Sequence, residues 1–242
     1  ELANDTVNAN DTVGAYTIVH NEPISSFPHI LDFDGSGTTA GNGTSGNPGV
    51  TGTTDWERIP DPANGGYAFH VMKEKTRSAA TGPRRDFSGT GNYLYTEGNF
   101  GTAPTSALFA SKCLDLGGMT NPVLDFMYHM YGSDIGAIAV QIVPANSNTW
   151  INIPGASIPG TTTQQSASID PWKYFKADLN TWAGQVVKIR FIAQKTGLGA
   201  ASDIALDNIR IYNKIATDVG IIHIGVPAQR IDTAAPISPQ FT

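Results

Sequence analysis

The chain has 242 residues, of which 26 are glycine and 15 are proline, and its net charge is −6. This composition predicts many turns and short strands rather than long helices. The acidic balance excludes nucleic acid as an expected partner, and no apolar run reaches the roughly 18 residues of a membrane span.

The first third of the chain alternates between weakly patterned and strand-like segments. Residues 1–22 are polar and predict a lead-in or linker. From Ile30 the residues read Ile-Leu-Asp-Phe-Asp-Gly, a short strand in which Asp32 and Asp34 share one face because strand side chains alternate. A loop rich in glycine and threonine follows, between Thr38 and Thr54.

The middle of the chain predicts a series of short strands, because apolar residues alternate there or aromatic and β-branched residues are enriched. The expected strands are 56–59, 67–71, 93–97, 107–109, 123–131, 135–143, 150–153, 172–179, 186–193 and 204–212. Residues 76–91 carry the turn signals of a loop. About a dozen strands are too many for one open sheet, so we expect an all-β sandwich of two antiparallel sheets over residues 23–213.

The C-terminal segment from residue 214 has a different residue pattern from the predicted strands before it. Residues 218–227 form an isolated apolar stretch with no obvious partner strand, followed by a tail that contains proline. We interpret residues 214–242 as a linker and the first strand of a truncated, following Ig-like domain. The chain is therefore expected to be covalently part of a larger multidomain protein.

Several motifs occur in a characteristic order from Phe33 to Tyr212. They open with Phe-Asp at 33–34 and Asp-Trp-Glu-Arg at 55–58, continue with Phe-Met-Tyr-His-Met-Tyr-Gly at 126–132, and close with Ser-Asp-Ile-Ala-Leu-Asp-Asn-Ile at 202–209. This order resembles the MAM family of meprins, neuropilins and receptor tyrosine phosphatases, over roughly three quarters of the chain. The resemblance implies a jelly-roll-like sandwich acting as a non-catalytic recognition or adhesion module, extracellular or at the cell surface.

The cysteine content departs from the animal members of that family. Their domains usually carry disulfides, whereas Cys113 is the one cysteine of this chain. The sequence is therefore more similar to bacterial, cleaved-adhesin-type relatives, in an exported adhesin or as an accessory domain of an exported hydrolase.

The resemblance also implies a structural cation near the first and last strands. The matching positions are Asp34 and Asp207, and we expect Asp86 and a turn carbonyl as further ligands, with Asp32 and Asp203 as reserves. Calcium prefers several carboxylate and carbonyl oxygens, which aspartates beside glycines in loops supply. The alternative is that these aspartates only cap turns by accepting hydrogen bonds from backbone N–H groups.

No catalytic motif stands out, so we expect that the chain is not an enzyme. His129 lies in a predicted strand on the face opposite Phe126 and Tyr128, where it could serve as a metal ligand or an acid–base group. A hydrogen-bonded structural histidine is the favoured interpretation. Neither a His-Glu-x-x-His pair nor a Gly-x-Ser-x-Gly elbow occurs in the sequence.

Two tryptophans are candidates for ligand binding. Trp150 borders a turn of proline, asparagine and serine, and Trp182 precedes Ala-Gly, so either could stack on a sugar ring. The alternative is that both fill the core. The sequence thus leaves two functions open: a protein–protein adhesion module, or a carbohydrate-binding module accessory to an exported hydrolase or protease. In either case the expected partner is a protein or a glycan at a cell surface.

Overall fold

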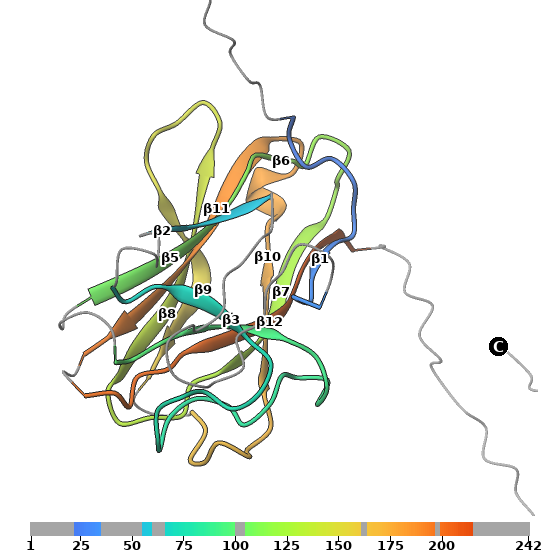
Figure 1. Cartoon of the computed structure of the whole chain (residues 1–242). Helices are drawn as coiled ribbons and strands as arrows, with labels where there is room; N and C mark the ends of the chain where they lie inside the picture. The colour runs from blue at the N-terminus through green and yellow to red at the C-terminus, as the bar shows by residue number, and fades with distance from the viewer. Residues whose placement is uncertain are drawn as a thin grey trace, which may run out of the picture.

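The computed structural model describes residues 22–34, 55–59, 66–99, 105–160, 164–196 and 199–214. Two antiparallel sheets pack face to face in this part of the chain (Figure 1). The predicted all-β sandwich is confirmed. All but the last residue of the predicted lead-in at 1–22, the whole loop between Thr38 and Thr54, and the apolar stretch at 218–227 lie outside the described residues.

The first sheet has six strands in the order β10-β7-β12-β4-β3, with β1 also paired to β12. Its strands are β1 (His29–Leu31), β3 (Phe69–Met72), β4 (Tyr93–Thr96), β7 (Pro122–His129), β10 (Lys173–Asp178) and β12 (Ala205–Asn213). Because β1 pairs antiparallel with β12, the first and last described strands lie side by side.

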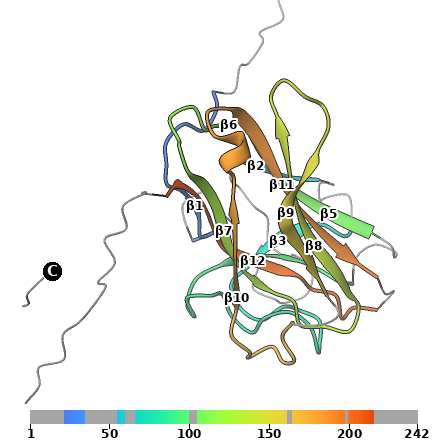
Figure 2. The same ribbon diagram turned by 180° about the vertical axis from the view of Figure 1, so that it is seen from behind.

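The second sheet also has six strands, in the order β2-β5-β11-β8-β9, with β6 paired to β11. Its strands are β2 (Trp56–Ile59), β5 (Thr105–Ser111), β6 (Leu114–Asp115), β8 (Ile135–Pro144), β9 (Ile151–Pro159) and β11 (Val186–Lys195). Figure 2 shows the two sheets from behind, with the outer face of each turned away from the other.

The core lies between the sheets and is rich in aromatic rings. Trp56 stacks on Phe109 with ring centroids 5.0 Å apart, and Phe126 meets Phe191 edge to face at 5.1 Å. Burying each such side chain contributes about 1.5–3 kcal/mol. The alternation that buries these rings leaves every second residue of the central strands on an outer face.

The first described strand is shorter than the sequence predicts. β1 ends at Leu31, and Phe33 has a positive φ of 58°, which breaks the strand before Asp34. Asp32 Oδ1 accepts a hydrogen bond from Asp34 N at 3.1 Å. The two aspartates therefore belong to a turn rather than to one strand face. Strand β6 and the 3₁₀ turn η2 (Asn180–Trp182) were not predicted from the sequence.

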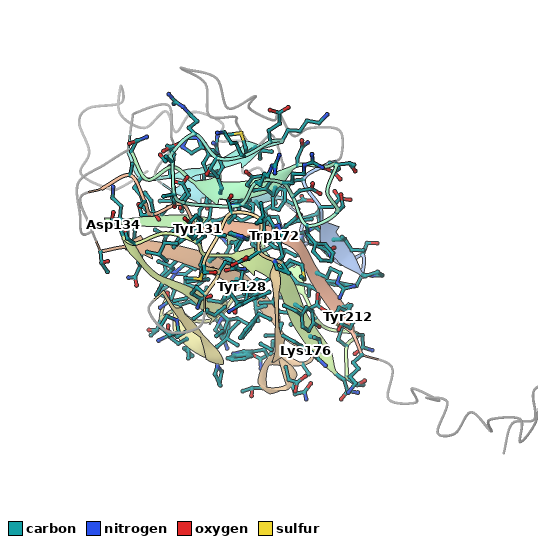
Figure 3. All side chains as sticks on the ribbon, turned by 90° about the horizontal axis from the view of Figure 1, so that it is seen from below. Tyr128, Tyr131, Asp134, Trp172, Lys176 and Tyr212 are labelled. Atoms are coloured by element: carbon teal, nitrogen blue, oxygen red, sulfur yellow. The ribbon has the colours of Figure 1, made fainter. Side chains whose placement is uncertain are left out.

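Two loops cover part of the outer face of the first sheet. The β3–β4 loop, residues 73–92, and the segment 164–172 lie side by side at one end of the sandwich (Figures 1 and 2). Arg84 N donates to Ser168 O at 2.8 Å, and Trp172 Nε1 donates to Arg85 O at 3.1 Å. Beneath them lies a small second cluster of Met72, Tyr93, Tyr95 and Ala205 with Trp172 packed against it. Figure 3 views the molecule from this end and labels Trp172.

Candidate functional site

The three aspartates predicted as metal ligands come from three separate segments. Asp34 lies in the turn after β1, Asp86 in the β3–β4 loop, and Asp207 in β12 beside an irregularity of its pairing with β7. Asn208, the next residue, has a positive φ of 47°, which marks the local distortion of the strand. The pairing of β1 with β12 brings the turn of Asp34 towards the strand of Asp207.

Asp34 and Asp207 tie loops to the sheet. Asp207 Oδ2 accepts from Phe87 N at 2.9 Å, and its Oδ1 accepts from Asn208 N at 2.7 Å. Asp34 Oδ1 accepts from Asn92 N, and Asn92 Nδ2 donates to Phe33 O at 3.0 Å. These bonds are the turn-capping role that the sequence left as the alternative.

Asp86 has an oxygen with unused hydrogen-bonding capacity. Its side chain is buried, and Oδ2 accepts from Ser88 N at 2.8 Å and from Ser88 Oγ at 2.5 Å. Oδ1 is buried and has no hydrogen-bond partner in the described part of the chain. A buried carboxylate oxygen without a partner is costly, and a bound cation would remove that cost.

The electrostatics link the same three residues. Burial, helped by the nearby charges of Asp86 and Asp34, raises the pKa of the Asp207 carboxyl to about 7, although the backbone hydrogen bonds from Phe87 and Asn208 oppose the rise. Three neighbouring carboxylates repel one another, which favours the binding of either a proton or a cation among them. The donor chemistry therefore fits calcium.

The geometry limits how such an ion could be bound. Across the described ranges, no group of three or more His, Cys, Asp or Glu side chains is arranged to hold a metal ion. A calcium ion here would need backbone carbonyl or water oxygens beside one or two carboxylates, a ligand set that calcium accepts.

Asp203, a reserve candidate, belongs to another cluster. It is fully buried, its Oδ1 accepts from Gly98 N at 2.7 Å, and burial and the charge of Glu97 raise its pKa well above the usual range. Lys195 Nζ donates to Gly98 O at 2.8 Å in the same place. Gly98 and Asn92 lie at opposite ends of β4, so Asp203 is separated from the turn of Asp34.

His129 is part of the packing beneath the loops. It is fully buried, its ring lies edge-on to Trp172 at 5.7 Å, and burial lowers its pKa to about 4. This burial agrees with a structural histidine. Its ring nitrogens have no partner within ordinary hydrogen-bond geometry in the described residues, but the Asp170 backbone and carboxylate lie close enough to oppose the lowering of its pKa.

The two candidate tryptophans have different environments. Trp182 belongs to the core and is 6% exposed, so no ring face is open to a sugar and the stacking interpretation fails for this residue. Trp150 is partly exposed at the edge of the second sheet. The guanidinium carbon of Arg190 lies 4.1 Å from the centroid of the Trp150 ring, a cation–π contact.

Arg190 continues a polar row across the outer face of the second sheet. Its Nε and Nη2 donate to Gln141 Oε1 at 2.8 and 2.5 Å, and Gln141 Nε2 donates to Asn152 Oδ1 at 2.8 Å. The register aligns Glu57, Ala110, Arg190, Gln141 and Asn152 across neighbouring strands. Sequence reasoning missed this row because its members are far apart in the chain and only strand pairing brings them together.

Two antiparallel sheets packed over an aromatic core, with the first and last described strands paired, define a β-sandwich module. The family model of the MAM domain, meprin/A5/mu, matches residues 54–215. The chain belongs to the MAM family, which confirms the resemblance found in its motifs. Helices that could cross a membrane are absent from the described residues.

Similar solved structures are distant in sequence. A cleaved adhesin domain of Lys-gingipain from Porphyromonas gingivalis is 14% identical over 77% of this chain and 98% of that one, with a TM-score of 0.44. A xylan-binding domain from Paenibacillus barcinonensis is 11% identical over 80% of this chain and 99% of that one, with a TM-score of 0.41. A module solved in complex with beta-1,4-galactotriose is 13% identical over 66% of this chain and 90% of that one, with a TM-score of 0.40.

Proposed function

We propose that the chain is a non-catalytic, extracellular recognition and adhesion module of a larger bacterial surface or secreted protein, and that it binds a protein partner through the outer face of the second sheet. One observation carries the proposal: an apolar row crosses that face from strand to strand. Ile59 pairs with Leu108, Leu108 with Ile192, and Ile192 with Ala139.

The side chains of this apolar row point away from the core. Their sequence neighbours Phe109, Phe191 and Val140 are buried, and successive strand residues face opposite sides. Ile59 is 44% exposed, and the other three are less than fully buried. Adjacent apolar side chains on an outer face are typical of an interaction surface rather than of a solvated sheet.

The polar row beside it supplies the border of such a surface. Glu57, Arg190 and Gln141 lie beside the apolar row on β2, β11 and β8, and Asn152 extends the polar row onto β9. An apolar centre bordered by polar groups and an arginine is the usual composition of a protein interface.

Structural calcium is the second part of the proposal. Asp86 and Asp207 hold the ion together with carbonyl oxygens, and Asp34 lies beside them. The unpartnered oxygen of Asp86 and the raised pKa of Asp207 support this assignment. The ion fastens the β3–β4 loop to β12 and takes no part in any reaction.

Binding of the labelled chain to an array of extracellular proteins and to an array of glycans tests the function. We expect binding to one or more proteins that Leu108→Asp abolishes, because the new charge would be buried at the centre of the interface. Lys176→Asp, which adds a carboxylate at an exposed position of β10 in the first sheet, is the matched control and should bind normally. Protein binding that survives Leu108→Asp, or no binding to either array, would overturn the proposal.

A carbohydrate-binding module is the second candidate, and Trp150 favours it. A partly exposed tryptophan beside the side chains of Arg190, Gln141 and Asn152 combines a stacking ring with hydrogen-bonding groups. In that case the chain would bind the glycan array alone, and Trp150→Ala would abolish the signal while Leu108→Asp weakened it less.

A further inference from the structure

A second surface feature lies away from the outer face of the second sheet. A pocket of about 510 Å³ opens between the two arms of the β3–β4 loop, in the first sheet. Lys73, Glu74 and Lys75 line it from the arm that follows β3, and Arg84, Arg85 and Thr90 line it from the returning arm.

The charge of this pocket is opposite to that of the protein. The chain carries a net charge of −6, yet four cations and one carboxylate line the pocket. The ion pairs in the described part of the chain join Lys112 to Asp55 and Arg210 to Asp125, so none of them neutralises a pocket cation. An excess of cations gathered around one pocket favours the binding of an anion.

Both arms are held at the backbone, which fixes the points from which the cationic side chains extend. Tyr93 Oη donates to Glu74 O at 2.5 Å on the first arm. Arg84 N donates to Ser168 O at 2.8 Å, and Trp172 Nε1 donates to Arg85 O at 3.1 Å on the second arm. A pocket whose walls are fixed before binding loses less conformational entropy when a ligand enters.

We propose that this pocket binds an anionic saccharide, a sugar that carries a sulfate or a carboxylate group. The volume suits a small ligand or the end of a longer one. Two adjacent arginines can donate paired N–H groups to sulfate or carboxylate oxygens, and the lysines add point charges. The Thr90 hydroxyl and the loop backbone offer hydrogen bonds to sugar hydroxyls.

The basic side chains are confined to one pocket, which favours a saccharide over an extended polyanion. Nucleic acid binding needs a basic stripe that follows many phosphates, whereas the basic charge here is gathered around one pocket of an acidic protein. The site goes beyond the proposed function, because it uses the loop end of the first sheet and leaves the outer face of the second sheet free.

Calorimetric titration of the full chain tests the proposal with four probes: a sulfated glycosaminoglycan tetrasaccharide, trigalacturonate, neutral galactotriose and inorganic sulfate. We expect at least one acidic saccharide to bind, more tightly than the neutral one and than sulfate, and to bind more weakly as ionic strength rises. The preferred acidic probe tells whether sulfate or carboxylate is the recognised group.

Paired substitutions locate the binding. Arg84→Gln with Arg85→Gln, and separately Lys73→Gln with Lys75→Gln, should each weaken binding by about tenfold or more, because each removes two charge-assisted contacts. Lys176→Gln with Lys188→Gln removes the same charge at exposed positions elsewhere and should leave the affinity within about twofold. All six positions are exposed, so unchanged melting curves are expected for every variant.

Several outcomes would overturn the proposal: no acidic saccharide binds, galactotriose or sulfate binds as tightly as the acidic saccharides, or the control pair weakens binding as much as the pocket pairs. Leu108→Asp separates this proposal from the protein-binding function. That variant should retain saccharide affinity even when protein binding is lost.

Discussion

The Asp207 carboxylate accepts a hydrogen bond from the backbone N–H of Phe87 at 2.9 Å, and this bond joins the last described strand to the β3–β4 loop. Asp86 precedes Phe87, so the bond places the unpartnered Asp86 oxygen near Asp207. The loop that carries the basic pocket is therefore fastened to the sheet through a carboxyl group whose charge depends on pH.

Removal of calcium tests the proposed metal site. We expect calcium to raise the melting temperature of the wild-type chain, by the equivalent of about 2.7 kcal/mol at one hundred times its dissociation constant. Asp86→Ala and Asp207→Ala should abolish the shift. Asp178→Ala, at an exposed position of β10, should retain it. A wild-type melting curve that excess chelator leaves unchanged would exclude the ion.

The calcium effect should depend on pH because of Asp207. Its pKa rises from 3.8 to about 7 in the folded protein, so the folded state holds this proton more tightly than the unfolded state. Without calcium, the stability that the protonated form provides is lost as the pH rises from 3.8 to about 7. Calcium replaces the proton, so its stabilising effect should be larger at pH above 7 than in mild acid. Melting curves across pH, with and without calcium, measure this, and a calcium effect that grows on acidification would contradict it.

The effect of His129 on the pH dependence of stability should be opposite to that of Asp207. Burial lowers its pKa from 6.5 to about 4, so the unfolded state binds the extra proton first on acidification. Its contribution to stability is fully present above pH 6.5 and is lost progressively as the pH falls towards 4. Denaturant unfolding of wild type and His129→Gln over this range should show a shallower acid decline in the variant. Parallel declines would show that His129 does not titrate as inferred.

A buried carboxylate stabilises the outer face of the first sheet. Asp125 is fully buried, Arg210 binds both of its oxygens at 2.7 Å, and Tyr174 Oη donates to Oδ2 at 2.9 Å. Arg210→Ala should lower the free energy of unfolding by about 3 kcal/mol, because it leaves a buried charge without its partner. Tyr174→Phe should cost about 1 kcal/mol. Chemical denaturation of both variants measures the two losses in the free energy of unfolding. Equal losses would contradict the larger contribution assigned to Arg210.

The two candidate tryptophans should respond differently to removal. Trp182→Ala creates a cavity in the core and should cost about 3–5 kcal/mol of stability. Trp150→Ala removes a partly exposed ring and its contact with Arg190, so it should cost about 1 kcal/mol or less. Melting curves of both variants check this order, and a larger loss for Trp150→Ala would refute it.

Local pattern was sufficient for most of the strands and for the family. Alternating apolar residues, as in 123–131, predict a strand from neighbouring residues alone, because side chains of a strand face opposite sides in turn. The ordered motifs from Phe33 to Tyr212 were likewise recognisable without coordinates, and the family match over residues 54–215 confirms the resemblance that they indicate. The sequence also singled out Asp34, Asp86 and Asp207, whose role as calcium ligands stays a prediction.

Only the tertiary structure decided which residues form surfaces and which form the core. Trp150 and Trp182 look alike in sequence, but the packing of η2 buries the second and the edge of the sheet exposes the first. Arg190 reaches Trp150 and Gln141 only through strand register, and Lys73 meets Arg84 across one pocket only because hydrogen bonds hold both arms of a loop. Periodicity determines local conformation, whereas contacts between distant residues depend on how the strands pair and how the loops are anchored, which no local pattern specifies.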